Sequence, residues 1–251
     1  MAFINGNNSI VTDKLHYYMD PGNKQSYIGS GTSCGSTVGT VPMGTLGASN
    51  VFSSDNGGIF NFDGATDYLE VASDGSTTGF NVNSYTICVW SKPTNTGQTA
   101  YDTFFSYDHT AHTTPYYGIH FRGYPTNSSS TSNRGKLIFV WNSAGTMTAN
   151  QYILTGTTST FVSGEWNMYS CTYTNNGTST TAAVYKNGTQ LSTVTRTQSA
   201  PTYFSQEVWL GKGNLASLQY DGGYGPCMFY QKALSQTEIT QNYNALKYRF
   251  E

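Results

Sequence analysis

TAAVYKNGTQL, residues 181–191, gives the strongest local indication of fold in this 251-residue chain. Two alternating runs flank Asn187 and Gly188. An Asn-Gly pair favours the type I′ turn of a β-hairpin, because both central residues of that turn need a positive φ. The segment therefore predicts two antiparallel strands.

Short alternating segments continue on both sides of this hairpin. WNMYSCTY, residues 166–173, places Tyr169, Cys171 and Tyr173 on one face of a strand, because successive side chains of a strand point to opposite faces. YTICVW, residues 85–90, alternates in the same way and ends before Pro93. Short strands with turn residues between them predict a sandwich or a barrel.

Two further strand pairs are visible. YYGIHFRGY and KLIFVW, residues 116–124 and 136–141, predict a pair joined by a polar loop. Residues 57–71 predict two short strands around a turn at Asp63 and Gly64. The Gly/Ser/Thr-rich residues 29–54 are long for a loop and predict short extended pieces.

One helix is expected near the end, in SQTEITQNYNAL, residues 235–246. Ser235 can cap it and Glu238 completes a capping box, while Leu234 and Ile239 are placed for a hydrophobic staple. The helix should lay its apolar side on the sandwich.

The composition excludes several classes of protein. Only 10% of the residues are charged, the net charge is −2 and 15% are aromatic, so there is no basic surface for nucleic acid. No apolar stretch is long enough to cross a bilayer, so no membrane insertion is expected. The start, MAFINGNNSI, shows no signal peptide, because no basic residues precede an apolar segment.

The four cysteines are scattered and form no CxxC spacing, which argues against a disulfide framework and against zinc. Free thiols in strand-like runs act as small apolar fillers. We expect all four to be reduced and structural: Cys34, Cys88, Cys171 and Cys227.

Seven segments, in their order, resemble the laminin-G-like branch of the concanavalin A-like lectin/glucanase superfamily, of the type found in tailed-phage and virus structural proteins. They are residues 15–32, 57–71, 85–93, 165–173, 183–191, 208–214 and 225–246. The resemblance implies an all-β, two-sheet antiparallel jelly-roll sandwich, here with one short C-terminal helix. Residues 1–13 would be an N-terminal arm and 14–251 the domain.

The resemblance implies a non-enzymatic binding or structural module, which we expect on a virion surface, in a capsid decoration, a fibre or a tail. Its partners would be other virion proteins or further copies of itself, with cell-surface glycans as targets. The alternatives are a free, extracellular carbohydrate-binding lectin and a glycoside hydrolase. Fold alone does not decide between them.

Catalytic residues are not evident. The glucanase branch carries its carboxylates in an E-x-D-x-x-E pattern on one strand, and no glutamate of this chain begins such a pattern. The nearest carboxylate pairs, Asp63/Asp67 and Glu70/Asp74, flank turns. We therefore predict no catalytic residue.

Sugar recognition uses an aromatic ring against the C–H face of the sugar, with polar side chains beside it. Candidates lie on the predicted strand pair 116–141 and in the loop QYDGGYGP. Because His120 and Arg122 alternate with Ile119 and Phe121, one of the two pairs should point outward. The alternative is that most of the 20 tyrosines pack in the interior. The predicted ligand-binding residues are Tyr116, Tyr117, His120, Arg122, Tyr124, Trp141, Tyr220 and Tyr224.

No cofactor is required, but two metal hypotheses remain. The acidic loop of the family implies a structural Ca²⁺ at Asp63 and Asp67, since carboxylates suit a hard cation; the alternative is a plain turn at Asp63. A second cluster, Asp102, Asp108, His109 and His112, could ligate a metal or form a polar loop between two strands.

Overall fold

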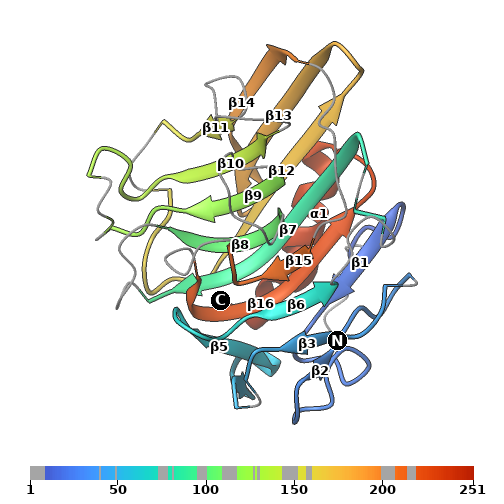
Figure 1. Ribbon diagram of the computed structural model, residues 1–251, viewed down its shortest axis with the longest axis vertical. Coiled ribbons are helices and arrows are strands. Elements are labelled where there is room, and N and C mark those ends of the chain that lie inside the picture. Colours follow the sequence, from blue (N-terminus) through green and yellow to red (C-terminus); the bar gives the residue numbers. More distant parts are fainter. Residues whose placement is uncertain are drawn as a thin grey trace, which may run out of the picture.

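Two antiparallel β-sheets pack face to face in this computed structural model, and one helix lies on the outside of one sheet (Figure 1). The described residues are 9–39, 41–48, 50–72, 79–80, 82–94, 101–108, 118–126, 128, 131–142, 152–156, 160–198, 207–213 and 219–251. Within them each sheet has eight strands. The predicted all-β sandwich with one short C-terminal helix is confirmed.

Sheet A has the strand order β14-β13-β12-β7-β16-β5-β4, with β1 also paired to β16. Its strands are β1 (Leu15–Met19), β4 (Phe52–Ser53), β5 (Ile59–Asp63), β7 (Ser84–Pro93), β12 (Asn167–Asn175), β13 (Ser179–Lys186), β14 (Thr189–Thr197) and β16 (Asp221–Tyr230).

Sheet B has the order β11-β10-β9-β8-β15-β6-β3-β2. Its strands are β2 (Ser33–Cys34), β3 (Gly44–Leu46), β6 (Leu69–Ala72), β8 (Asp102–Asp108), β9 (Gly118–Gly123), β10 (Leu137–Asn142), β11 (Tyr152–Leu154) and β15 (Glu207–Leu210). Three short pieces, β2, β3 and β4, occupy the Gly/Ser/Thr-rich stretch, as predicted.

The local turn predictions have different outcomes. Asn187 and Gly188 have φ values of 50° and 80° and join β13 to β14, which confirms the predicted hairpin. The strands on either side of Asp63 also exist, but β5 belongs to sheet A and β6 to sheet B. This turn therefore carries the chain from one sheet to the other.

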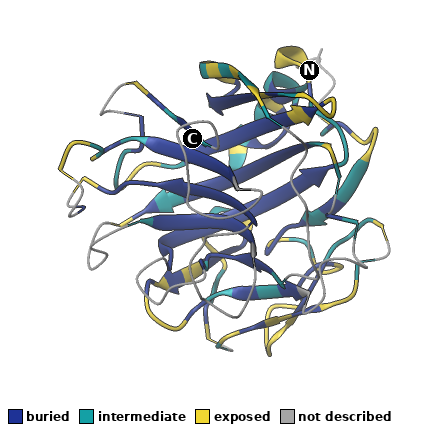
Figure 2. Cartoon of the chain, turned by 45° about the horizontal axis from the view of Figure 1, so that its top comes forward, coloured by how far each residue is buried: buried dark blue, intermediate teal, exposed yellow. Residues whose placement is uncertain are grey.

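The core lies between the sheets, where strand after strand is buried (Figure 2). Tyr169, Cys171 and Tyr173 all point into it, as their alternation predicted. Ring contacts connect the layers: the ring centroids of Phe105 in sheet B and Phe229 in sheet A are 5.8 Å apart. Buried aromatic pairs of this kind contribute about 0.5–1.5 kcal/mol beyond the area that they bury.

The outer face of sheet A is covered by α1 (Gln236–Leu246). Ile239 and Leu246 of the helix join Cys88 and Met228 of the sheet in a second apolar cluster. The ring of Trp90 stacks on Phe250, with 4.5 Å between the centroids. Sheet A thus has a buried apolar cluster on each of its faces.

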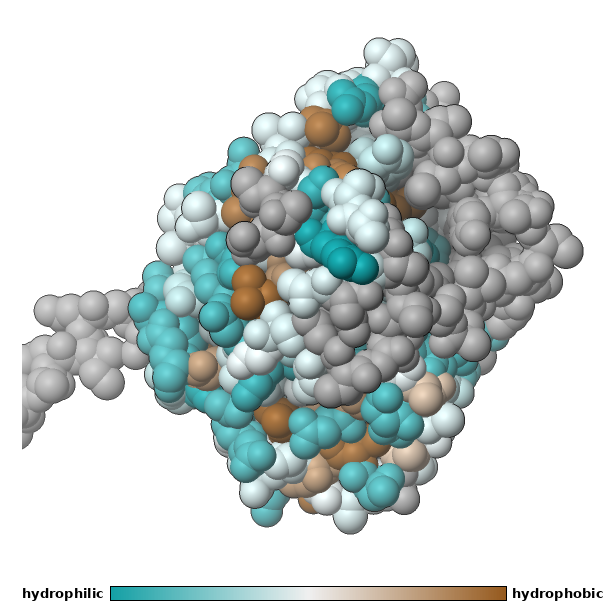
Figure 3. All heavy atoms as spheres, turned by 90° about the vertical axis from the view of Figure 1, so that its left-hand side faces the viewer, coloured by the Kyte–Doolittle hydropathy of each residue, from teal (hydrophilic) through white to brown (hydrophobic). Residues whose placement is uncertain are grey.

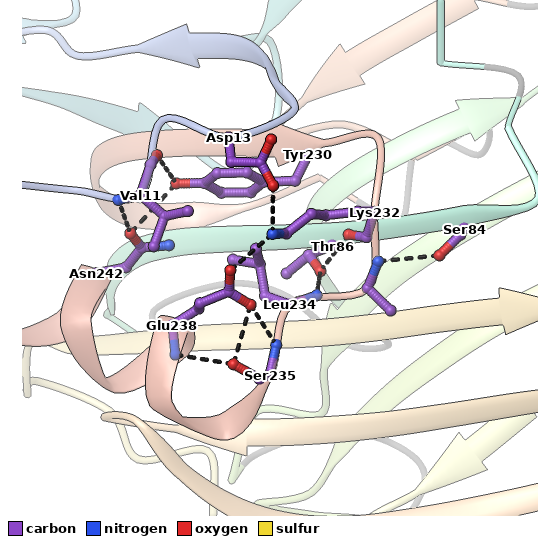
Figure 4. Close-up of polar contacts among 11 residues, drawn as sticks. Val11, Asp13, Ser84, Thr86, Tyr230, Lys232, Leu234, Ser235, Glu238 and Asn242 are labelled. Carbon is purple, nitrogen blue, oxygen red and sulfur yellow. Dashed lines mark hydrogen bonds and ion pairs between the residues drawn. The ribbon is translucent and has the colours of Figure 1, made fainter.

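The start of α1 has the predicted capping box (Figure 4). The Ser235 hydroxyl accepts the backbone N–H of Glu238 at 3.3 Å, and the Glu238 carboxylate accepts the N–H of Ser235 at 2.8 Å. Each bond satisfies a backbone donor that the first turn leaves without a helical partner. The cap fixes where the helix begins above the sheet.

Residues 9–13, the described part of the predicted arm, pack on this same side (Figure 4). The N–H of Val11 donates to Oδ1 of Asn242 at 2.8 Å, and the Tyr230 hydroxyl donates to the Val11 carbonyl at 2.9 Å. Lys232 bridges Asp13 and Glu238, at 2.7 Å from each carboxylate. The start of the described chain is therefore attached to α1 and β16.

All four cysteines are free and buried, as predicted. Burial raises the pKa of Cys88 to about 11 and the pKa of Cys34 and Cys227 to about 12. The thiols are therefore protonated fillers of the interior. Among the described residues, no helix is long and apolar enough to cross a membrane.

Candidate functional site

The outer face of sheet B differs from that of sheet A in its polar side chains. Ile119 and Phe121 of β9 point into the core, so the side chains that alternate with them, His120 and Arg122, point to the outer face. The predicted alternation is confirmed. His120 is 1% exposed and Arg122 is 7% exposed, so both are outward-facing but buried.

The register of the strands arranges this face in a row. Glu70 of β6 lies opposite Trp209 of β15, Trp209 opposite Ser106 of β8, Ser106 opposite His120, and His120 opposite Val140 of β10. Neighbouring strands are about 4.8 Å apart, so the row extends over roughly 19 Å. A carboxylate, an indole, a hydroxyl and an imidazole thus follow one another across four strands, and the apolar Val140 ends the row on the fifth.

Two polar atoms of this face are buried without a hydrogen-bond partner: Nε1 of Trp209 and Oγ1 of Thr103, which lies opposite Arg122. A buried donor without an acceptor destabilises the fold by about 1–3 kcal/mol. Nε1 of Trp90 under α1 is equally unpartnered, so the feature gains its weight from its place in the polar row.

The β6 end of the row is its accessible end. Tyr68, Glu70 and Lys212 are half-buried there, in contrast to the fully buried Ser106. Nζ of Lys212 lies 3.9 Å from the ring centroid of Tyr68 and 4.7 Å from that of Trp209. We call Tyr68, Trp209 and Lys212 the Lys212 cluster; it joins two aromatic rings to a cation.

The other end of the face carries a second aromatic group. Tyr124 and Tyr101 have ring centroids 4.6 Å apart and a hydroxyl–hydroxyl distance of 3.3 Å, and the guanidinium of Arg122 lies 5.3 Å from the Tyr101 ring. Burial, and then the hydrogen bond with Tyr101, raise the pKa of Tyr124. The phenol therefore stays neutral at physiological pH.

The structure separates the predicted ligand-binding residues into three groups. His120, Arg122 and Tyr124 lie together on the outer face of sheet B. Tyr116 and Tyr117 lie outside the described residues. The remaining three are fully buried in the core between the sheets: Trp141, Tyr220 and Tyr224.

Each of these three core residues has an interior contact. Trp141 donates from Nε1 to Gln198 at 3.0 Å, the Tyr220 hydroxyl donates to the Gly223 carbonyl at 3.0 Å, and the Tyr224 hydroxyl donates to the Phe104 carbonyl at 2.8 Å. They face the opposite sheet and have no surface for a ligand in this conformation. We therefore leave them out of the candidate site.

The Lys212 cluster was missed by sequence reasoning. Trp209 and Lys212 occur in VWLGKGN, which contributed to the family resemblance and whose first part, EVWLG, predicts a strand. The available signal was the alternation of Val208 and Leu210, both core residues, around Trp209. That pattern points the indole outward, but only the register shows Tyr68 and Glu70 beside it.

The Asp63 turn does not fit calcium in this conformation. Oδ1 of Asp63 accepts the backbone N–H groups of Ala65, Thr66 and Asp67 at 2.8, 2.7 and 3.0 Å. Burial acts to raise the pKa of Asp63, but these donors outweigh it and the pKa is lowered. Backbone N–H groups already bind the carboxylate oxygen of Asp63 that a cation would need. Calcium binding at this turn therefore stays a prediction.

A buried carboxyl pair lies elsewhere, where β8 and β16 begin. Oδ1 of Asp102 accepts the N–H of Asp221 at 3.2 Å, and Oδ1 of Asp221 accepts the Thr94 hydroxyl at 2.6 Å. Burial raises the pKa of Asp102 to about 8. With exposures of 1% and 7%, Asp102 and Asp221 face no substrate, so this pair is not placed for glycoside cleavage.

The second metal hypothesis is not tested. Asp102 is described, but His109 and His112 lie outside the described residues, as does the side chain of Asp108. In the part of the chain that the structure describes, no three His, Cys, Asp or Glu side chains are grouped as metal ligands.

Comparison with known proteins decides the family. The family model described as the concanavalin A-like lectin/glucanases superfamily matches residues 63–240, more than half of the chain. This chain belongs to the concanavalin A-like lectin/glucanase superfamily. No curated protein sequence matches it.

Solved structures share the fold of this superfamily member at low sequence identity. Domain 4 of AbnA, a GH43 extracellular arabinanase from Geobacillus stearothermophilus solved with arabinotriose, has a TM-score of 0.63 and 17% identity, covering 92% of this chain and 98% of that one. The Ruminococcus gnavus IT-sialidase CBM40 bound to α2,3 sialyllactose has a TM-score of 0.51 and 14% identity, with 72% and 94% covered.

A third similar structure is the binding domain of Paraclostridial Mosquitocidal Protein 1, with a TM-score of 0.59 and 13% identity, covering 92% of this chain and 52% of that chain. At these identities the likeness shows the fold alone. The chain therefore has the fold of known carbohydrate-binding modules.

Proposed function

We propose that this chain is a non-enzymatic carbohydrate-binding module that holds a glycan on the outer face of sheet B. The observation that carries the proposal is the row from Glu70 to His120, which contains a buried, unpartnered indole N–H. The binding modules with the same fold support the choice of ligand class.

The Lys212 cluster would receive the first sugar. A sugar presents C–H groups that pack on an aromatic face and hydroxyls that need hydrogen bonds. Tyr68 offers a half-buried ring, while Lys212 and Glu70 offer a donor and an acceptor beside it. Trp209 is only 4% exposed, so its ring would be reached after Lys212 moves off it. The buried His120 and Arg122 would contact a longer glycan only after the residues that bury them move aside.

The described surface of the molecule is polar in places and weakly charged. Figure 3 shows hydrophilic and apolar residues intermixed over the described part of the face that it displays. Since only 10% of the residues are charged, hydrogen bonds and ring contacts would determine affinity more than long-range attraction.

The test is a glycan array followed by calorimetry on the best ligand. Trp209→Phe keeps a ring and removes only the N–H, so it should weaken binding about tenfold, the effect of one lost hydrogen bond in a desolvated site. Trp90→Phe is the matched control: its Nε1 is also buried and unpartnered, but it lies under α1 on the opposite sheet. Equal affinity for both variants, or no binding across the array, would refute the proposed site.

The same samples test for glycoside hydrolysis. Glu70 is the carboxylate of the row, and an enzyme of this class needs two carboxyl groups at the scissile bond. Release of reducing sugar by the wild-type chain, lost in Glu70→Gln, would replace the binding proposal with an enzymatic one. We expect no release.

A virion-surface location is the second candidate, with other virion proteins or further copies of the chain as partners. It rests on the weakly charged, tyrosine-rich composition and on the resemblance to phage and virus structural domains. Mass spectrometry of purified particles would test it. Absence of the chain from particles would leave an extracellular lectin as the better interpretation.

A further inference from the structure

A pocket of about 390 Å³ lies at the edge of sheet A, beside β4, and shares no lining residue with the outer face of sheet B. Two chain segments form it: residues 21–29 on one side and 52–57 on the other. Its volume is within the range of small-molecule sites, roughly 300–1,000 Å³.

The walls of this edge pocket are held in place from outside it. Arg249, after α1, donates from Nη1 to Asp20 at 2.7 Å, from Nε to the Asn56 carbonyl at 3.0 Å and from Nη2 to the Gly58 carbonyl at 3.0 Å. Asn56 returns a bond from Nδ2 to the Arg249 carbonyl at 2.7 Å. One side chain thus ties both walls together.

The backbone here adopts a conformation that ordinary residues avoid. Asn56, Gly57 and Gly58 have consecutive φ values of 52°, 74° and 118°. A Cβ on Gly22 would lie 2.1 Å from the Gly57 carbonyl oxygen, and a Cβ on Gly58 would lie 2.3 Å from the Cα of Gly22. Glycine adopts a positive φ without strain, so Gly57 and Gly58 let this segment come into close contact with Gly22 beside the pocket.

The lining combines apolar surface with one charge. Phe52 is half-buried, and Ile28 is 73% exposed, which is unusual for a large apolar side chain. Lys24 is the single charged side chain of the lining, and no carboxylate lines the pocket. The Ser54 hydroxyl precedes the short helical turn Asp55–Gly57 without capping it.

We propose that this edge pocket binds a single terminal sugar ring that carries a carboxylate. The C–H face of the ring would pack on Phe52 and Ile28, the carboxylate would pair with Lys24, and a hydroxyl would reach Ser54. The proposal shares with the proposed function only the saccharide class of the ligand, because the residues are different.

The test uses the full chain with ¹⁵N-labelled glycine, titrated with D-glucuronate and D-galacturonate and, in parallel, with D-glucose and D-galactose. The acidic sugars should shift the amide signals of Gly22, Gly29 and Gly57, which line the pocket. Lys24→Gln should weaken the acidic sugars about three- to fivefold, the range of an exposed ion pair, and Phe52→Ala should weaken them further. Lys136→Gln is the matched control for the charge.

The outcomes separate the two proposals. Equal shifts with neutral and acidic sugars, or an unchanged affinity in Lys24→Gln, would overturn the acidic ligand. If none of the three glycine amide signals shifts, the pocket is not a binding site. This conclusion does not depend on how Trp209→Phe changes glycan affinity at sheet B. Because Lys24 is exposed, its substitution should not disturb folding, and the unshifted amides of the remaining glycines would verify this.

Discussion

The two sheets of this molecule have similar inner faces and contrasting outer faces. Sheet A presents Trp90, Met168 and Met228 on its outer face, and α1 seals them. Sheet B presents Ser106, His120 and Arg122 there, beside a smaller apolar cluster that includes Ile138 and Val140. Apolar burial under the helix stabilises the fold, whereas burying polar groups opposes it. Under the proposed function, the helix-covered outer face of sheet A would serve stability and the outer face of sheet B would serve recognition.

Substituting the tryptophan of each outer face should break this contrast most strongly. Trp90 stacks on Phe250 and Tyr243, with centroid distances of 4.5 and 5.6 Å, so Trp90→Ala should lower the free energy of unfolding by about 3–5 kcal/mol. Trp209→Ala removes a ring that is 4% exposed, so it should also destabilise the chain, but only this variant should lose glycan affinity. Urea unfolding followed by circular dichroism measures the stability of both variants, and calorimetry measures their affinity; an equal loss of affinity in Trp90→Ala would contradict the division of roles.

Asp102 tests the place where the two sheets meet, since it joins β8 to the backbone of β16. Its raised pKa, about 8, means that the folded chain holds this proton more tightly than the unfolded chain does. The resulting stabilisation is complete near pH 4 and is lost as the pH rises through 8. Asp102→Asn should therefore stabilise the fold by about 2–4 kcal/mol at pH 9 and have little effect at pH 4.

Thermal unfolding of both proteins across this pH range would show the effect. The exposed Asp55→Asn is the control for removing a charge. A pH-independent difference between Asp102→Asn and the wild type would mean that burial of Asp102 does not govern its protonation.

Removing the capping box should change the free energy of unfolding least, and it tests most directly whether the two outer faces act independently. Ser235→Ala removes the bond to the Glu238 N–H and should destabilise the chain by about 1 kcal/mol. If the faces act independently, calorimetry should find unchanged glycan affinity in this variant. A large loss of affinity would show that the helix side and the sheet B side are coupled.

Much of the fold could be predicted because its signals are local. An Asn-Gly pair predicts a hairpin turn, and a Ser-x-x-Glu sequence predicts a helix cap. Strict alternation predicts that Tyr169 and Tyr173 point to the same face of their strand. Alternation does not state which sheet a strand joins. That is why the Asp63 turn could be located, while the passage of the chain from sheet A to sheet B could not.

The site was less predictable because aromatic residues occur both in the core and on the outer face of sheet B. In residues 137–141, Leu, Ile, Phe, Val and Trp are all apolar, so the sequence does not reveal that Trp141 points inward and Val140 outward. His120 and Arg122 could be placed, since they alternate with the apolar Ile119 and Phe121. Tyr68 and Trp209 are far apart in sequence and meet only through the pairing of β6 with β15.

Both ends of the described chain return to α1. The Ser9 carbonyl accepts a hydrogen bond from Gln241 at 2.9 Å, and the Glu251 carboxylate accepts one from Tyr243 at 3.0 Å. Anything joined to either end, whether a tether, a label or a neighbouring domain, would thus attach on the helix side. The attached group would then lie on the α1 side of the molecule, and the outer face of sheet B would point away from it.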